Sequence, residues 1–481
     1  MNNRLSCVFA VIIVMFSLIF YACPELEEDP VDDVLGGYIM AYNVELTYGA
    51  WIEILTEISE QDQDVRLDLS NCSTSELPGV YHAFINWRWE NAAKTRSFDF
   101  RVFNPAPWMN DLPYDEEADE VDAAEIYRSA KSKIVSVILP RTATMIGIGD
   151  GPNSAAFKGF TNLRSIEGER IVFIGDYAFY GLQNLRNARF LSAGDFEVNP
   201  PPAPNPNSAD DVSDENGFLR SIGEFAFYGC SSLTEVDFPD AKIIGRNAFA
   251  YCTGLTEITQ ANLRNVWRIE QGAFRGCTNL VSIYFRNATK ISSEAFLGCT
   301  SLREARFMNT QKQYITGVHP LQPFLENPNS PNPPFNYDSV VFDRGAFSGC
   351  KALERLEIPY AWNVYFAADA LADIGTHLEL HLFDDDGAES FGHPQTDDYF
   401  GHRTGSSALH SRSLTSIKIV LPRVEDESQF RSDEDYYTDC LDDPPCDDMS
   451  NCETRIQIAR LFHDIRGRYG EDAIEIEIAR Y

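Results

Sequence analysis

Histidine and glutamate alternate along one short segment near the C-terminal end of the chain. Five of the eight histidines lie between His377 and His410. If residues 376–382 form a strand, His377, Glu379 and His381 share one face, because side chains alternate between the two faces of a strand. Two imidazoles and a carboxylate are a chemically reasonable zinc set. One hypothesis is therefore a metal-dependent hydrolase centred on this segment, and the alternative is a solvated polar strand face.

The cysteines offer a second kind of chemistry, but their positions favour packing. Five of them occupy one position of a recurring phrase, where Phe160 and Leu182 stand in other copies. Interchange with phenylalanine and leucine predicts a buried row of small apolar thiols without chemical use. The five are Cys230, Cys252, Cys277, Cys299 and Cys350.

Three further cysteines lie in an acidic stretch near the C-terminus. Cys440, Cys446 and Cys452 have five residues between successive members and lack the close pairs of a zinc ribbon. A disulfide among them is compatible with an exported chain, and the spacing does not fix which two would pair.

No established catalytic motif is present in the sequence. It contains no Gly-x-Ser-x-Gly elbow and no His-Glu-x-x-His pair, and Gly147, Gly149 and Gly151 lack the third spacing of a phosphate-binding loop. The sequence therefore predicts a protein that is not an enzyme and carries no cofactor.

The elements that position these side chains come from a phrase that recurs seven times. Each copy has a small residue, a phenylalanine, an apolar or cysteine position three residues later and a leucine three residues further on. A period of 22 to 25 residues predicts a solenoid, because one unit cannot bury its apolar face alone and must stack on its neighbours. The anchors are Phe157, Phe179, Phe227, Phe249, Phe274, Phe296 and Phe347.

The stretch after each leucine alternates like a strand, which predicts a parallel sheet with turns or short 3-10 segments between strands. Outward positions then form two rows across the sheet, the second of which is our candidate binding face. The first row is Ser165, Asn187, Glu235, Glu257, Ser282, Glu304 and Arg355, and the second is Glu167, Arg189, Asp237, Thr259, Tyr284, Arg306 and Glu357.

The N-terminus reads as an export signal. Arg4 precedes an apolar run that ends at Tyr21, and Ala22 and Cys23 follow. The run is short for a membrane span, and a cysteine after a small residue is typical of a lipoprotein signal, which predicts lipidation of Cys23.

The remaining chain divides by composition and pattern. We expect a signal peptide over 1–22, an acidic tether over 23–37, an N-terminal cap over 38–131, repeats over 132–372 and a C-terminal α/β cap over 373–481. Proline-rich inserts interrupt the repeats at about 192–216 and 309–338. An aromatic insert in the first cap contains Trp87, Trp89 and Trp108, a composition favoured either at binding hot spots or in packing against the cap.

Charge excludes one class of partner. The chain has 73 acidic against 39 basic residues and a net charge of −34. Contact with nucleic acid requires clustered cations, so the sequence argues against nucleic-acid binding and against membrane contact other than through the N-terminal lipid.

The repeat phrase also resembles a known family. Residues 222–239, IGEFAFYGCSSLTEVDFP, resemble the BspA-type leucine-rich repeat of surface proteins in host-associated bacteria, and residues 65–72 and 132–140 resemble the entry region of spirochaete members. This resemblance implies a leucine-rich repeat fold and a non-enzymatic surface protein that engages host proteins, glycans or other bacteria. The expected function is adhesion by a lipid-anchored protein of the outer membrane or cell surface. A passive structural envelope lipoprotein is the first alternative, ahead of the hydrolase.

Overall fold

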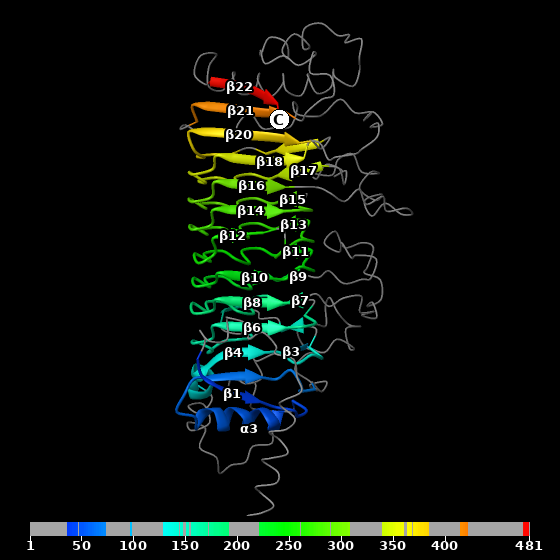
Figure 1. Cartoon of the computed structure of the whole chain (residues 1–481), viewed down its shortest axis with the longest axis vertical. Coiled ribbons are helices and arrows are strands. Elements are labelled where there is room, and N and C mark those ends of the chain that lie inside the picture. Colours follow the sequence, from blue (N-terminus) through cyan, green and yellow to red (C-terminus); the bar gives the residue numbers. More distant parts are fainter. Residues whose placement is uncertain are drawn as a thin grey trace, which may run out of the picture.

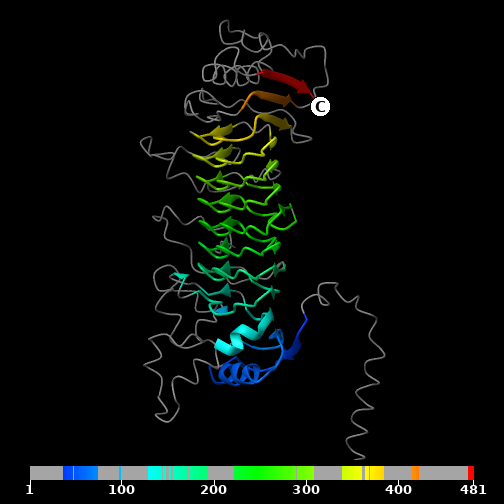
Figure 2. The same cartoon turned by 90° about the vertical axis from the view of Figure 1, so that its left-hand side faces the viewer.

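The protein is an elongated stack of coils in the computed structural model, with the chain running from one end to the other (Figures 1 and 2). The structure describes residues 36–46, 48–73, 97–98, 128–143, 145–147, 151–152, 155–171, 173–191, 221–259, 261–288, 290–307, 339–359, 363–367, 369–383, 414–421 and 475–480. Several predictions therefore concern residues outside the described part: the signal with Cys23, Trp87, Trp89, Trp108, both proline-rich inserts, and Cys440, Cys446 and Cys452.

Three parallel sheets form two faces of this stack. One face carries two sheets in succession, and the other carries a single sheet of shorter strands. The first sheet is β1 (Tyr38–Ala41), β2 (Val65–Asp68), β4 (Ile134–Ile138), β6 (Ser165–Gly168), β8 (Asn187–Phe190) and β10 (Glu235–Asp237). The second is β12 (Glu257–Ile258), β14 (Ser282–Phe285), β16 (Glu304–Phe307), β18 (Arg355–Pro359), β20 (His377–Phe383), β21 (Ser416–Leu421) and β22 (Glu475–Arg480).

The opposite face was not predicted as a sheet. It contains β3 (Ser97–Phe98), β5 (Met145–Ile146), β7 (Phe173–Ile174), β9 (Ser221–Ile222), β11 (Ile243–Ile244), β13 (Arg268–Ile269), β15 (Lys290–Ile291), β17 (Ser339–Phe342) and β19 (Asn363–Phe366). Most of these strands have two residues, too few to show an alternating pattern. The leucine-rich repeat solenoid with parallel strands, turns and few helices is nevertheless confirmed.

A helix closes the N-terminal end of the stack. The helix α3 (Tyr48–Ser59) buries Trp51, Ile54, Leu55 and Ile58, four apolar residues at helical spacing. In Figure 1 it lies below β1 and β2, and residues 128–133 add a second helical segment before β4. Within the described part of the chain, no helix combines the length and apolarity needed to cross a bilayer.

The sheet continues beyond residue 372, where we expected the repeats to end. Strand β20 pairs with β18, β21 with β20 and β22 with β21, all in parallel. The strand predicted over 376–382 is therefore present as β20, and β20, β21 and β22 all extend the repeat sheet.

The core is a column of stacked phenylalanine rings. The seven anchor phenylalanines are fully buried, and successive rings lie 4.8–5.3 Å apart at interplanar angles of 4–27°. This spacing is close to the separation of neighbouring strands, about 4.8 Å, so one ring per coil keeps the rings in stacking contact along the axis. The leucine six residues after each anchor is also fully buried.

The cysteine row is buried as predicted, and it makes a hydrogen bond that the sequence did not reveal. Each thiol donates to the carbonyl oxygen of the anchor phenylalanine in the preceding coil, at 3.1–3.2 Å. The carbonyl of Phe249, for example, accepts both the Cys252 amide and the Cys277 thiol. A carbonyl oxygen has two lone pairs and can accept two hydrogen bonds. The thiol uses the second one, which a phenylalanine or leucine at the cysteine position, as in the coils with Phe160 and Leu182, cannot use.

We expect these thiols to be unreactive in the folded protein. Burial raises the pKa of Cys230, Cys252, Cys277 and Cys299, so the nucleophilic thiolate is depleted at neutral pH. Alkylation by iodoacetamide, followed by mass spectrometry of each cysteine peptide, should be on the order of 100-fold slower before unfolding than after it. Equal rates in the two states would contradict the buried row.

Candidate functional site

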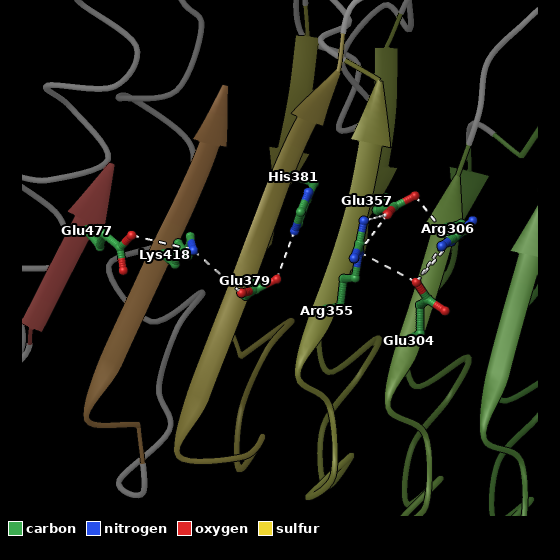
Figure 3. Close-up of polar contacts among 8 residues, drawn as sticks. All are labelled: Glu304, Arg306, Arg355, Glu357, Glu379, His381, Lys418 and Glu477. Atoms are coloured by element: carbon green, nitrogen blue, oxygen red, sulfur yellow. Dashed lines mark hydrogen bonds and ion pairs between the residues drawn. The ribbon is translucent and has the colours of Figure 1, made fainter. Parts of the chain in front are cut away.

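Eight polar side chains lie side by side on five neighbouring strands of the second sheet, in two groups of contacts, one on β16 and β18 and the other on β20 to β22 (Figure 3). We call this set of side chains the polar ladder. Its members are Glu304 and Arg306 on β16, Arg355 and Glu357 on β18, Glu379 and His381 on β20, Lys418 on β21 and Glu477 on β22.

Strand alternation places these side chains on one face. Ala305, Leu356 and Leu380 point into the core between the ladder residues of their strands. The register then aligns the polar positions: Glu304 lies opposite Arg355, and Arg306 lies opposite Glu357. Parallel pairing without a register shift repeats this alignment from strand to strand.

Two arginines and two glutamates form a closed box on β16 and β18. Arg306 contacts Glu304 at 2.7 Å and Glu357 at 3.2 Å. Arg355 donates to Glu357 at 2.6 Å and lies 3.5 Å from Glu304. Glu357 is only 9% exposed, so both arginines are needed to offset the loss of its hydration. Its predicted outward position holds, but the arginines cover it.

The ladder continues on β20 to β22 with weaker contacts. His381 lies 3.0 Å from Glu379, and Lys418 lies 3.9 Å from Glu379 and 3.4 Å from Glu477. The hydrogen bond with His381 holds the pKa of Glu379 below its usual range, although partial burial opposes this. Glu379 is therefore a carboxylate at neutral pH.

The histidine-containing strand does not gather the three side chains proposed for zinc. His381 pairs with Glu379, whereas the Nδ1 atom of His377 lies 2.6 Å from the hydroxyl of Ser416 on β21. Among the residues that the structure describes, no group of three or more histidine, cysteine or acidic side chains is arranged to hold a metal ion.

The predicted rows are present but interrupted. In the first sheet, Glu167 lies opposite Arg189, which lies opposite Asp237, as expected. Thr259, however, leaves the strand, and its amide and hydroxyl contact the side chain of Asn262 at 3.1 and 2.6 Å. Strands β10 and β12 are consequently not paired, so the rows divide into two segments.

The sequence contained a signal for this break. The coil from Phe249 to Phe274 has 25 residues where its neighbours have 22, and the extra residues follow β12. Sequence reasoning also missed that Glu379, Lys418 and Glu477 continue the first row and that His381 continues the second. Their alternation with buried leucine and isoleucine could have revealed them.

The stacked parallel strands, the recurring leucines and the exposed polar rows define a leucine-rich repeat protein. A family model for the BspA type leucine rich repeat region matches residues 125–195 and 214–316 in six copies. The repeats within these two ranges therefore match the BspA-type leucine-rich repeat, as the resemblance of residues 222–239 indicated. The gap in the match falls within the first proline-rich insert.

Solved structures are similar to this chain at low identity. A leucine-rich repeat protein of T. pallidum is 21% identical, with a TM-score of 0.25, and the match covers 46% of this chain and 66% of that one. A leucine-rich cell surface protein of Faecalibacterium prausnitzii is 18% identical, with a TM-score of 0.26 and coverage of 58% and 77%. A leucine-rich repeat protein of Bacteroides ovatus is 18% identical, with a TM-score of 0.25 and coverage of 58% and 61%. This chain thus spans just under two thirds of the T. pallidum protein. A comparison with curated proteins gives no match.

Proposed function

We propose that this chain is a lipid-anchored cell-surface protein that binds a protein partner through the polar ladder. The observation that carries the proposal is the alternation of charge along one row of the ladder. Glutamate and a basic residue take turns on five neighbouring strands, in the order Glu304, Arg355, Glu379, Lys418 and Glu477. Such a pattern can select a partner with the complementary sequence of charges and reject others by like-charge contacts.

The fixed geometry of the box supports binding. Arg306 and Arg355 are each held by two glutamates, so less side-chain entropy is lost when a partner docks than for free arginines. Exposed ion pairs contribute only about 0–1 kcal/mol each to stability, so stability alone is a weak reason for this network.

The location of the protein is part of the proposal. The apolar run before Cys23 supports export and lipidation, and a surface-anchored solenoid would present its ladder to host matrix proteins, glycans or other bacteria. Loss of labelled palmitate incorporation in Cys23→Ala, together with protease digestion of the protein on intact cells, would test anchor and exposure separately.

The binding test is a charge inversion that keeps the ion pair. We expect the double variant Lys418→Glu with Glu477→Lys to bind at least about tenfold more weakly, because the outward pattern of charge reverses at both positions. The pair between residues 418 and 477 survives, while the longer contact of residue 418 with Glu379 becomes a contact between like charges. Binding of immobilised protein to purified matrix proteins and to intact bacterial cells is measured for wild type and variant.

The opposite face supplies a matched control. Lys290 and Asp343 form an ion pair at 2.7 Å on that side, so Lys290→Asp with Asp343→Lys inverts a similar pair away from the ladder. This control should bind like the wild type. Equal binding by the ladder variant would contradict the assigned face, and absence of any captured partner would favour the passive envelope component.

The hydrolase remains the alternative from another class. It would be supported by hydrolytic activity that is lost in the double variant His377→Ala with His381→Ala.

A further inference from the structure

Two positions in the turns of the solenoid recurrently hold a residue with positive φ. The position two residues before the anchor phenylalanine, or before Leu371 in the last turn of this type, is occupied by Asn247, Gly272, Glu294, Gly345 and Asp369, with φ of 51–67°, and in two coils by Tyr177 and Phe225, with φ of 58° and 55°. The position two residues after the anchor is occupied by Gly159, Gly181, Gly229, Gly276, Gly298 and Gly349, by Asp373 after Leu371, and in one coil by Tyr251, with φ of 62°.

Aromatic residues at these positions are unexpected. Glycine, asparagine and aspartate tolerate the left-handed region, whereas a bulky side chain there costs on the order of 1 kcal/mol or more. Tyr177, Phe225 and Tyr251 bear this cost in three successive coils, in the turns that follow β7, β9 and β11.

The three strained residues join two others in one cluster. Tyr177 stacks on Phe225 at 5.0 Å, and Tyr180 stacks on Tyr228 at 5.0 Å with an interplanar angle of 2°. Tyr251 meets Tyr228 edge to face at 5.4 Å. We call Tyr177, Tyr180, Phe225, Tyr228 and Tyr251 the aromatic stripe.

The stripe is not part of the core. Tyr251 is 42% exposed, and the other four side chains are half-buried, whereas the anchor phenylalanines beside them are fully buried. Stacking returns about 0.5–1.5 kcal/mol per pair, which is no more than the strain costs. The chain thus keeps strained, solvent-facing aromatics where its other described coils use glycine, asparagine, aspartate or glutamate.

We propose that the aromatic stripe is a second binding surface, and that it binds an extended proline-rich peptide of a partner protein. Such peptides adopt a polyproline II helix that docks on aromatic-lined surfaces at a low entropic cost. The inference is independent of the polar ladder, which lies on strands of the second sheet, whereas the stripe lies in turns that follow β7, β9 and β11.

Spacing and hydrogen bonding support this ligand. Tyr180, Tyr228 and Tyr251 follow one another at 5.0 and 5.4 Å, and a polyproline II helix repeats after three residues, about 9.3 Å, close to two such steps. Prolines at i and i+3 would therefore meet rings two coils apart. Proline peptides offer carbonyl acceptors but no amide donors at proline, and tyrosine hydroxyls can donate to them.

The charges around the stripe suit an uncharged ligand. Asp176 and Glu224 lie near Tyr177 and are opposed by Arg246, while Arg275 near Tyr228 is paired with Glu294 at 3.0 Å. The rings themselves carry no charge, so a neutral proline-rich segment can lie on them without burying a charge of its own.

The test uses substitutions that relieve strain. Tyr251→Gly installs the residue that six equivalent positions already carry, so we expect an unchanged or higher melting temperature together with at least about tenfold weaker binding of a fluorescein-labelled proline decamer. Fluorescence anisotropy measures binding to the full-length protein, and Tyr177→Asn is a second variant with the same expectation. Tyr284→Ala, on the ladder face, is the control that should bind normally.

Each other outcome overturns the proposal. A lower melting temperature with unchanged decamer binding would assign the stripe a purely structural role. Absence of decamer binding, or binding of an oligosaccharide such as cellohexaose instead, would exclude this ligand class. If the decamer bound only after replacement of residues 199–207 by glycine and serine, the chain's own insert, and not a partner, would be the occupant.

Discussion

Replacing Phe249 by alanine should lower the free energy of unfolding by about 3–5 kcal/mol, the range found for removing a buried phenylalanine ring. Phe249 is fully buried between Phe227 and Phe274, whose ring centroids lie 5.1 and 5.2 Å away. The neighbouring rings cannot close the gap, because the hydrogen-bonded strands fix the distance between coils. Urea denaturation followed by circular dichroism measures the loss.

The column predicts where the effect of Phe249→Ala should appear. Each coil contacts only its neighbours, so hydrogen exchange should accelerate first in the coils around Phe227 and Phe274. Phe249→Leu should cost less, since Leu371 occupies the equivalent position in the last turn of this type. Val281→Ala is the control: at 42% exposure it should change stability by no more than about 0.5 kcal/mol. A loss in Phe249→Ala as small as in this control would contradict the stacked column.

The interior of the solenoid was predictable because its signal repeats. The anchors, the leucines and the cysteines of the phrase each occupy the same position in every coil. A wrong assignment in one copy is therefore visible by comparison with the other copies. The N-terminal helix was predictable for a different reason. Trp51, Ile54, Leu55 and Ile58 have the spacing of one apolar helix face, and all four are buried.

The arrangement of the surface residues was less predictable, because it depends on side-chain contacts that differ from coil to coil and do not repeat with the sequence period. The repeat spacing predicted Thr259 in the second row, but its amide and hydroxyl bind the side-chain oxygen of Asn262, and it lies outside the strand. The two-residue strands of the second face, such as Ile243–Ile244, are defined by pairing with neighbours rather than by their own pattern. The aromatic stripe was missed because a positive φ at Tyr177, Phe225 and Tyr251 contradicts what residue type predicts.

A buried lysine at the junction of cap and repeats gives the second large expected effect. Lys131 is 4% exposed, and its ammonium lies 5.9 Å from the centre of the Phe160 ring. Burial, with a smaller effect from Lys158, lowers the pKa of Lys131 from 10.5 to about 8. At neutral pH the folded protein therefore holds a charge that its surroundings disfavour, by about 3 kcal/mol at 1.36 kcal/mol per pKa unit.

We expect Lys131→Met to raise the free energy of unfolding at pH 7 by up to about 3 kcal/mol, because methionine keeps the apolar contact with Phe160 and removes the charge. The sign of the pH dependence follows from proton counting. Between pH 8 and about 10.5 the unfolded wild type binds the proton and the folded form does not, so wild-type stability rises with pH in this window. The advantage of the variant should therefore be constant below pH 8 and disappear as the pH approaches 10.5.

The neighbouring lysine provides the matched control, since it has the same charge and the opposite role. The ammonium of Lys133 donates to the carbonyl of Ser59 at 2.7 Å and to that of Gln61, at the C-terminal end of α3. Lys133→Met removes charge-assisted hydrogen bonds and should destabilise the protein by about 1.5–3 kcal/mol at pH 7. Urea denaturation of both variants at pH 7, 9 and 10 separates the two lysines, because only the Lys131→Met difference should shrink with pH. If that difference were absent at pH 7, or stayed constant to pH 10, the charge of Lys131 would not be strained in the folded state.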